Sequence, residues 1–440
     1  MKTTTPHIKR STSFLRRLLP LVIAGGAVAI LILTLQGGPL TVDPELLEGR
    51  VPTAEELSPS VEAAFRAESY KPGEVATLAF FNHATGVKLQ LFHTGPEHTT
   101  TVGNSEMQGV PVSPLRRVGT VAPGRTVQIA IGSWPSGVYF VRLTAADGRV
   151  GFAPVIVAPR KLGAHRVLVV MPTMTWQAYN LRDDDGNGKG DSWYYSWTIH
   201  QAHLYRPYLD RGVPYHFRSY DLPFLHWMAW TNHQADFLAD GDLDAIASPE
   251  ALASAYDLII FPGHHEYVTT HEYTLIRGYR DLGGNLAFLS ANNFFWQTLR
   301  SGNTIERTKQ WRDLDVPEAA LIGTAYRAND DGQHRGPWIV RSVESAPWLF
   351  AGTGLQNGST FGTGGIEIDK TSDASPANVH VLAEIPDVLG PGLTAQMTYY
   401  ETPAGAKVFG AGAFTLAGEV ISNPTVAQLV ANLWTHLELP

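Results

Sequence analysis

The sequence predicts an α/β fold with a mostly parallel sheet, preceded by a β-sandwich and by an N-terminal transmembrane helix. Three observations lead to this prediction: an uncharged apolar run near the N-terminus, alternating short strands from about residue 68, and continuous apolar strands after residue 160. We therefore divide the chain into a signal anchor or signal peptide (1–40), a linker (41–67), a β-sandwich domain (68–160) and an α/β domain (161–440).

The N-terminal segment has the charge pattern of an exported protein. The apolar run Leu18–Leu35 contains no charged residue and is long enough to cross the hydrocarbon core of a membrane. Basic residues flank it on the N-terminal side only, which predicts a cytoplasmic N-terminus and an exported remainder. Because no clear A-x-A cleavage site follows, we favour an uncleaved anchor over a cleaved, secreted form. The basic residues are Lys2, Lys9, Arg10, Arg16 and Arg17.

Composition excludes several other classes of protein. The 440 residues are 44% hydrophobic and 17% charged, as is ordinary for globular domains, and the net charge is -8. This charge argues against a nucleic-acid partner, since no excess of Lys and Arg exists to neutralise phosphates. The absence of cysteine excludes disulfides and thiolate metal sites. The composition leaves open whether the protein forms a homo-oligomer.

Residues 68–160 predict an immunoglobulin-like β-sandwich. Apolar and polar residues alternate in four short segments, and Pro/Gly turns such as "KPG", "APG" and "PSG" separate them. Strands at this spacing are typical of a two-sheet sandwich. The segments are "EVATLAFFN", "VKLQLFH", "RTVQIAIGSW" and "GVYFVRLTA".

The pattern changes after Arg160, where three continuous apolar runs predict parallel strands that are covered on both faces. The last two enclose the helical pattern "HEYTLIRGYRDLGG", so together they form a βαβ unit. Ligands of such sheets bind beyond the carboxyl ends of the strands. We therefore expect a crevice at the loops that follow "RVLVVM" (166–171), "YDLIIFPG" (256–263) and "NLAFLSAN" (285–292).

The loop "FPGHHEYVTTHEY" superficially resembles a zinc motif. The helical motif H-E-x-x-H fails, because Thr269 stands where the second histidine should be and His271 lies six residues after His265. Glu266 remains notable, since a carboxylate at the end of an apolar strand is rarely buried without a partner. We expect His265, His271 and Glu272 to face solvent or to cap the following helix.

Five segments in this region resemble the N,N-dimethylformamidase β-subunit family in their chain order. The resemblance implies a glutamine-amidotransferase-like, flavodoxin-like domain that hydrolyses the C–N bond of a small amide. The segments between the motifs are shorter here, and no small companion subunit is visible. The motifs are "TWQAYN", "DLPFLHWM", "YDLIIFPGHHEYVTTHEY", "DLGGNLAFLSANNFFW" and "MTYYETPAGAKVFGAGAF".

The resemblance also implies a mononuclear iron held by two tyrosines and one glutamate. Glu266 and Tyr179 match two of these ligands, and Tyr194 or Tyr195 is our expectation for the third, with Tyr220 behind them. Hard oxygen ligands suit a ferric ion. The same comparison makes His264 and Asn292 neighbours of the substrate carbonyl and Glu401 a base or water-orienting residue.

Without the resemblance, several of these residues have simpler interpretations. Tyr179 could only pack, Asn292 could only bond the backbone of its turn, and Glu401 could belong to a surface turn. Two further functions therefore stay open. One is a non-catalytic surface or carbohydrate-binding protein, and the other is a hydrolase that uses Glu266 as a general base without a metal.

A second metal signal is the acidic segment "DDDGNGKGD" (183–191). Asp183, Asp185 and Asn187 followed by Gly fit the spacing of a calcium loop, with Asp191 at the ninth position. The twelfth position is a tyrosine where an EF-hand has a glutamate, so the segment is either a calcium-binding loop or a solvated turn. Farther along, we expect residues 299–395 to form long loops and short strands that cover the crevice.

Overall fold

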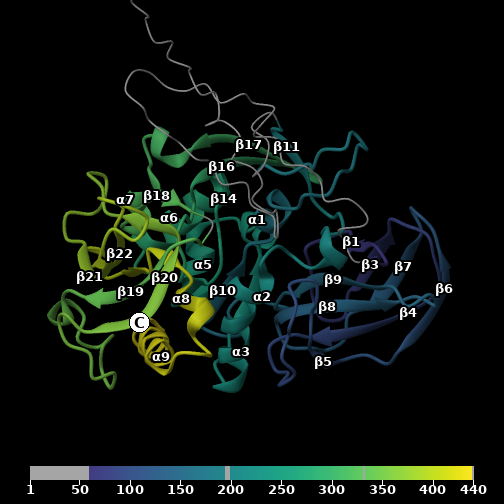
Figure 1. Ribbon diagram of the computed structural model, residues 1–440, viewed down its shortest axis with the longest axis horizontal. Helices are drawn as coiled ribbons and strands as arrows, with labels where there is room; N and C mark the ends of the chain where they lie inside the picture. The colour runs from purple at the N-terminus through teal and green to yellow at the C-terminus, as the bar shows by residue number, and fades with distance from the viewer. Residues whose placement is uncertain (1–58, 194–198, 331, 439–440) are drawn as a thin grey trace, which may run out of the picture.

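The computed structural model describes residues 59–193, 199–330 and 332–438 of the chain. The predicted anchor Leu18–Leu35 lies outside these ranges. Among the described residues, we find no helix that combines the length and the apolar character needed to cross a membrane. Figure 1 shows a β-rich unit, drawn in purple and blue, beside a larger unit that runs from teal to yellow.

Two sheets face each other between Ala63 and Val157. The first has the strand order β1 (Ala63–Phe65), β3 (Val75–Phe80), β7 (Thr126–Ala130). The second has the order β2 (Ser69–Tyr70), β9 (Val150–Val157), β8 (Gly137–Thr144), β4 (Ala84–His93), β5 (Val110–Pro111), with β6 (Arg116–Val121) also paired to β4. Alternate residues point inward, as in β7, where Val127 and Ile129 are buried between exposed neighbours.

The larger unit is built on a mixed sheet of eleven strands within the described ranges. Five strands are parallel, in the order β12 (Asp236–Ala239), β10 (Val167–Met171), β13 (Leu258–Phe261), β15 (Asn285–Phe288), β23 (Lys407–Gly410). The sheet continues with antiparallel pairings through β22 (Ala395–Glu401), β21 (His380–Ile385), β19 (Arg335–Val340), β20 (Thr360–Lys370) and β18 (Ala325–Asn329), and β24 (Ala413–Phe414) pairs with β20.

The prediction of a mostly parallel, flavodoxin-like sheet is therefore wrong. β22 and β23 are joined by the short turn 402–406, and such a short connection can only join antiparallel neighbours. Residues 299–395 were expected to form long loops and short strands that cover the crevice, yet they supply β18 to β21 of the sheet. Their glycines hid this, because small residues such as Gly364 and Gly365 in β20 break the alternation that signals a strand.

The parallel half has the buried two-sided character that its apolar runs predict. In β10, Val167, Val169 and Met171 join one core, whereas Leu168 and Val170 join the other. Helices α5 (Pro249–Ala255) and α6 (Thr270–Asp281) contribute to the second core. Helices α3 (Leu222–Trp230), α8 (Leu416–Glu419) and α9 (Pro424–Leu437) contribute to the first.

The remaining elements lie around this sheet. A small sheet has the order β11 (Gln201–His203), β17 (Thr304–Gln310), β16 (Trp296–Ser301), β14 (Tyr267–Thr269). The other helices are α1 (Thr173–Ala178), α2 (Phe217–Tyr220), α4 (Asp240–Asp244) and α7 (Glu318–Ile322), with single 3-10 turns at Asp210–Gly212, Trp311–Asp313 and Val343–Ser345.

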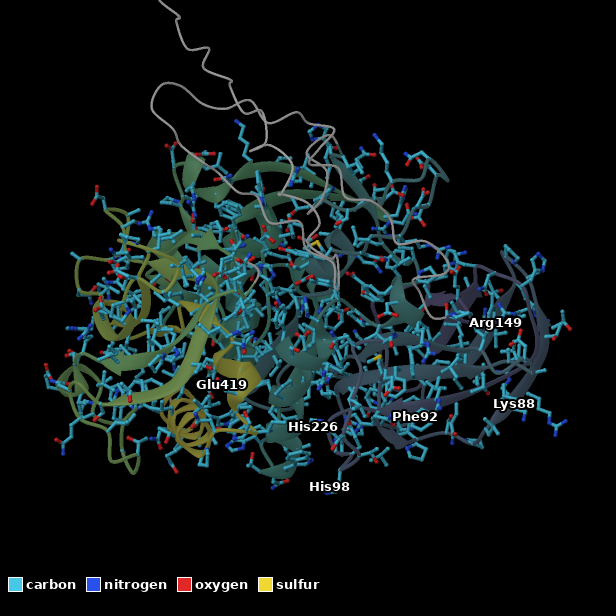
Figure 2. All side chains as sticks on the ribbon, viewed as in Figure 1. Lys88, Phe92, His98, Arg149, His226 and Glu419 are labelled. Carbon is cyan, nitrogen blue, oxygen red and sulfur yellow. The ribbon has the colours of Figure 1, made fainter. Side chains whose placement is uncertain are left out.

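The sandwich contacts the larger unit at α3, and its strands β8 and β9 also contact β12 and the turn Asp210–Gly212. Figure 2 shows His226 at this junction, with Phe92 and Lys88 farther along β4 and Arg149 near the far end of the sandwich. His226 Nδ1 lies 2.8 Å from the carbonyl oxygen of Gly95, in the loop that follows β4. The side chains of His226 and Glu97 are both buried and approach to 3.7 Å. The loop after β4 and helix α3 are therefore in a buried, hydrogen-bonded contact.

Candidate functional site

The strand-end loops of the parallel half bring several motif residues together. α1 follows β10 and ends at Ala178, so Tyr179 stands at its C-terminal cap. Glu266 lies in the loop between β13 and β14. Asn292 follows β15 and has a left-handed backbone, with φ 52°. All three are at the carboxyl edge of the sheet, where ligands of parallel sheets bind.

Tyr179 and Glu266 are in direct contact. The phenol of Tyr179 donates a hydrogen bond of 2.5 Å to Glu266 Oε2. The exposed fractions are only 9% for Tyr179 and 5% for Glu266, so water does not screen the pair. The ring of Tyr179 also stacks on that of Tyr215, with centroids 5.9 Å apart. The packing fixes the direction of the phenol toward Glu266.

His264 lies between two carboxylates at this edge. Its Nε2 atom is 3.5 Å from Glu266 Oε2 and 3.4 Å from Glu367 Oε2. The side-chain amide of Asn292 approaches the same nitrogen at 3.4 Å. The ring of Phe414 lies edge-on to the imidazole at 4.8 Å. His264 therefore contacts residues of its own loop, of the loop after β15, of β20 and of β24.

Glu367 is the residue that the motif comparison missed. It lies in β20, and only one residue separates it from the buried Asp369. The Asp369 carboxylate accepts a 2.9 Å hydrogen bond from the backbone N–H of Asn292, so β20 is tied directly to the loop after β15. The signal was present in "GIEIDK", where two carboxylates alternate with isoleucines on one strand.

Burial changes the ionisation of these groups. It lowers the pKa of His264 to about 3, with a further contribution from the nearby His216, so the imidazole is neutral. Burial also raises the pKa of Glu266 to about 7, against the hydrogen bond from Tyr179 and the positive charge of Arg307. The pKa of Asp369 rises to about 7 for the same reason, although the Asn292 N–H opposes the shift. Burial therefore favours the neutral forms of His264, Glu266 and Asp369.

A buried cation stands behind Glu266. Arg307 on β17 donates a 3.2 Å hydrogen bond to the carbonyl oxygen of Trp193, and its guanidinium lies 4.8 Å from the ring centroid of Trp296. Only 8% of Arg307 is exposed. Its charge favours the ionised form of Glu266 and thus partly offsets the cost of burying that carboxylate.

The structure does not bring Glu401 into this group. Glu401 is exposed at the end of β22 and opposes Lys407, the first residue of β23. Because β22 runs antiparallel to β23, its last residue lies at the amino edge of the parallel strands, opposite the site. There Glu401 Oε1 accepts a 2.6 Å hydrogen bond from the phenol of Tyr399.

The other expected tyrosines divide into two cases. Tyr194 and Tyr195 lie outside the described residues. Tyr220 is at the end of α2, and its ring lies 5.0 Å from that of Phe414, which in turn contacts His264. Tyr220 therefore belongs to the wall behind the site.

The remaining residues of the segment "FPGHHEYVTTHEY" point elsewhere. Glu272 caps α6 by accepting from the backbone N–H of Thr269 at 2.7 Å, and His271 is exposed on the same helix. Both follow the expectation. His265 does not, since it is only 1% exposed and its Nε2 lies 3.9 Å from Asp240 Oδ1. The side chain of His265 thus points away from those of His264 and Glu266, and the sequence motif does not show the direction of each side chain.

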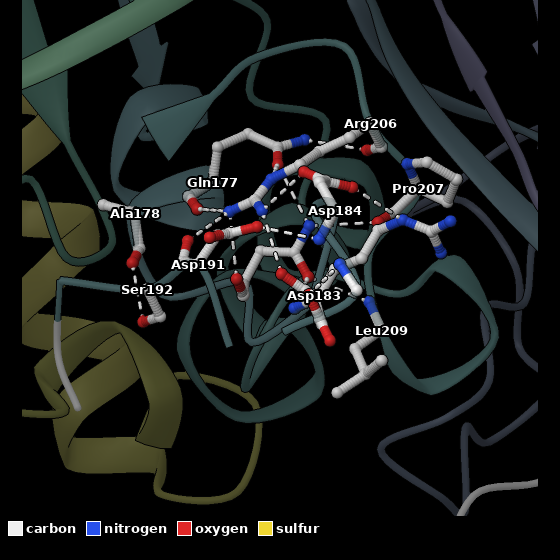
Figure 3. Close-up of polar contacts among 12 residues, drawn as sticks. Gln177, Ala178, Asp183, Asp184, Asp191, Ser192, Arg206, Pro207 and Leu209 are labelled. Atoms are coloured by element: carbon white, nitrogen blue, oxygen red, sulfur yellow. Dashed lines mark hydrogen bonds and ion pairs between the residues drawn. The ribbon is translucent and has the colours of Figure 1, made fainter. Parts of the chain in front are cut away.

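The acidic segment forms a compact turn at the surface. Carboxylate oxygens of Asp183, Asp185 and Asp191 lie within 4.8 Å of one another. Asp183 also accepts from the backbone N–H groups of Gly186 and Gly188, at 2.7 and 2.8 Å. Asn187 Oδ1 accepts from the backbone N–H of Lys189 at 2.8 Å. The segment connects α1 to Trp193, whose carbonyl oxygen binds Arg307. Figure 3 shows Asp183, Asp184 and Asp191 of this turn.

Comparison with known proteins confirms the resemblance. A family model described as "N,N-dimethylformamidase beta subunit-like, C-terminal" matches residues 122–423. No curated protein matches.

Similarity to solved structures is slight. The sporulation control protein Spo0M from Bacillus subtilis has a TM-score of 0.16 and 17% identity over 24% of this chain and 50% of its own. Superoxide reductase from Ignicoccus hospitalis has a TM-score of 0.15 and 14% identity over 23% of this chain and 80% of its own. A glucanotransferase from Paenibacillus sp. has a TM-score of 0.17 and 9% identity over 53% and 45%. This chain thus covers about half of the Spo0M chain.

Proposed function

We propose that this chain, which belongs to the N,N-dimethylformamidase beta subunit-like family, hydrolyses the C–N bond of a small amide at the site around Glu266. Family membership supports an amidohydrolase in general terms. The substrate class, the metal and the roles of individual residues are our proposals.

The hydrogen bond between Tyr179 and Glu266 carries the proposal. A phenol and a carboxylate converge in a buried setting, and both are hard oxygen donors of the kind that a ferric ion prefers. We propose that these two residues hold iron together with Tyr194 or Tyr195. Such an ion, when bound, supplies Lewis-acid polarisation of a carbonyl oxygen.

The side chains around this pair suit an amide substrate. Asn292 Nδ2 is a donor at the carboxyl edge of the sheet, and we propose that it binds the substrate carbonyl oxygen. His264 is neutral, since burial keeps its pKa low, and it can orient the substrate without adding a charge. The apolar ring of Phe414 closes one side.

We propose that Glu367 takes the role first expected of Glu401. Its Oε2 atom lies 3.4 Å from His264 Nε2, at the same edge as Glu266. A carboxylate there can accept a proton from the attacking water and return it to the leaving amine. The exposed position of Glu401 at the opposite edge does not suit this role.

Metal analysis and an amidase assay of the purified protein test the proposal. We expect about one iron per chain, visible absorption from phenolate-to-iron charge transfer, and hydrolysis of N,N-dimethylformamide or a related formamide. A colourless, metal-free protein without amidase activity would favour the non-catalytic alternative. Activity without metal would instead favour Glu266 as a general base.

We also propose that the acidic segment binds calcium. The close approach of Asp183, Asp185 and Asp191 favours this interpretation over a solvated turn. Asn187 offers a fourth oxygen in the same turn. A melting experiment with calcium and with chelator tests it.

A further inference from the structure

Arg206 is a buried arginine whose nitrogen atoms all bind one short stretch of chain. It follows β11 and is only 2% exposed. Figure 3 shows its guanidinium among residues of the segment 177–191, which runs from the end of α1 through the acidic turn. Nη2 donates to the carbonyl oxygens of Gln177 (3.0 Å), Asn180 (3.0 Å) and Asp191 (2.8 Å), Nη1 to the Arg182 carbonyl (3.1 Å) and Asp184 Oδ2 (2.9 Å), and Nε to Gln177 Oε1 (3.2 Å).

These contacts cap the C-terminal end of α1. The last carbonyl groups of a helix have no partner within it, and a cation there also interacts favourably with the helix dipole. Arg206 Nη2 binds the carbonyls of Gln177 and Asn180, which stand on either side of the pair Ala178 and Tyr179. The Ala178 carbonyl is bound separately, by the Ser192 hydroxyl at 2.8 Å. The backbone around Tyr179 is therefore held from both sides.

The fork of the guanidinium is essential to this arrangement. One planar group with five N–H donors meets acceptors in several directions, which a lysine ammonium cannot reproduce. The Asp184 carboxylate supplies the compensating charge, so Arg206 is not buried without an ionic partner. Asp184 in turn contacts Arg182, whose guanidinium reaches Glu62 at the edge of the sandwich.

We propose that Arg206 is a positioning residue for Tyr179. It fixes the end of α1 and the following loop in the geometry that directs the phenol to Glu266. The effect on catalysis rests on the proposed function, whereas the effect on the backbone around Tyr179 does not.

Arg166 provides a control at the end of another helix, although its side chain is half exposed whereas that of Arg206 is buried. It too binds the last carbonyls of a helix, those of Ser254 and Ala255 at the end of α5, at 3.0 and 2.8 Å. It too pairs with an aspartate, Asp257. However, Arg166 precedes β10 and thus lies at the amino edge of the sheet, opposite the site. Loss of Arg166 removes a similar cap without touching Tyr179.

The test compares Arg206→Lys, Arg206→Met and Arg166→Met with the parent protein. Hydrogen exchange followed by mass spectrometry measures protection in peptides that cover residues 173–193, and iron titration monitored by visible absorption measures the state of the tyrosine ligand. We expect both Arg206 variants to lose protection in these peptides, Lys less than Met. We also expect a shifted or weaker absorption band and a fall in amidase rate of about 100-fold for Met, since misplacement by about 1 Å costs this much.

Arg166→Met should lower the melting temperature but leave exchange in 173–193, the absorption band and the rate unchanged. The proposal is overturned if the Arg206 variants keep parental protection in 173–193, or if Arg166→Met disturbs the site equally. If Arg206→Met fails to fold, Arg206→Lys decides. Should the parent protein bind no iron and hydrolyse no amide, the proposed function fails while the exchange data still decide the role of Arg206.

Discussion

The phenol of Tyr179 donates a 2.5 Å hydrogen bond to Glu266, although the two lie 87 positions apart in sequence. One residue ends the helix after β10, and the other follows β13, its parallel neighbour in the sheet. Parallel pairing places both strand ends at one edge, so the contact follows from the topology of the sheet. Because a buried phenol and a buried carboxylate meet here, we place this pair at the centre of the proposed site.

The first prediction concerns this pair. Glu266→Gln keeps the shape of the side chain but removes its charge, and Tyr179→Phe removes only the phenol oxygen. We expect both variants to lose iron, visible absorption and amidase activity, because a metal site needs its ionised ligands. Metal analysis, absorption spectra and a formamide hydrolysis assay measure these three properties.

His271→Ala is the control for these variants. His271 is exposed on α6, and its Nε2 lies 2.8 Å from the Ile246 carbonyl oxygen. It should keep iron and activity, with at most a small loss of stability. A Glu266→Gln variant that retains its iron and its colour would contradict the proposal that Glu266 is an iron ligand.

The second prediction separates Glu367 from Glu401. Glu367→Gln removes the proposed proton acceptor beside His264 and should lower the amidase rate about 100-fold, as expected for loss of a general base. Glu401→Gln should change the rate by less than about twofold, because the residue is exposed at the opposite edge. Steady-state kinetics of both variants decide between them, and the reverse order of effects would restore Glu401 to the site.

The third prediction concerns calcium. If Asp183, Asp185 and Asp191 enclose an ion, calcium should raise the melting temperature relative to chelator, because a ligand that binds only the folded state stabilises it by about 2.7 kcal/mol at 100 times its Kd. Asp185→Asn should abolish this shift. Asp147→Asn, at an exposed hairpin of the sandwich, should keep it. Equal melting of the parent protein with calcium and with chelator would leave a solvated turn.

The fourth prediction concerns pH and Asp221. This carboxyl is 2% exposed and accepts a 3.2 Å hydrogen bond from the Trp176 indole. Burial raises its pKa from an ordinary 3.8 to about 8, against that hydrogen bond. Between these values the folded state holds a proton that the unfolded state has lost, so this group lowers the free energy of unfolding as pH rises from about 4 to 8.

Asp221→Asn keeps the acceptor for Trp176 and removes the titration. The parent protein should therefore lose stability relative to the variant by up to about 1.4 kcal/mol per pH unit in this window. Urea unfolding of both proteins at pH 5, 6, 7 and 8 measures the difference. A constant difference across the series would show that Asp221 does not titrate between these values.

Local sequence patterns were sufficient to predict the parallel strands, the loops that follow them and the start of α6, because these depend on residues close together in sequence. The apolar runs at β10, β13 and β15 require burial on both faces, and buried strands of this kind pair in parallel. Their following loops then share an edge. This reasoning places Tyr179, Glu266 and Asn292 at one edge without any coordinates, and the Thr269–Glu272 spacing likewise indicates the start of α6.

Strand direction in the second half of the sheet was decided only by tertiary structure. The edge that a residue reaches depends on whether its strand runs parallel or antiparallel to the rest, and no local pattern in β20 or β22 records this. Consequently Glu367 reaches His264, whereas Glu401 lies at the opposite edge. The role of Arg206 could not be predicted from sequence either. Its acceptors are mostly backbone carbonyl oxygens, which every residue carries. Only the folded chain brings these oxygens around one guanidinium.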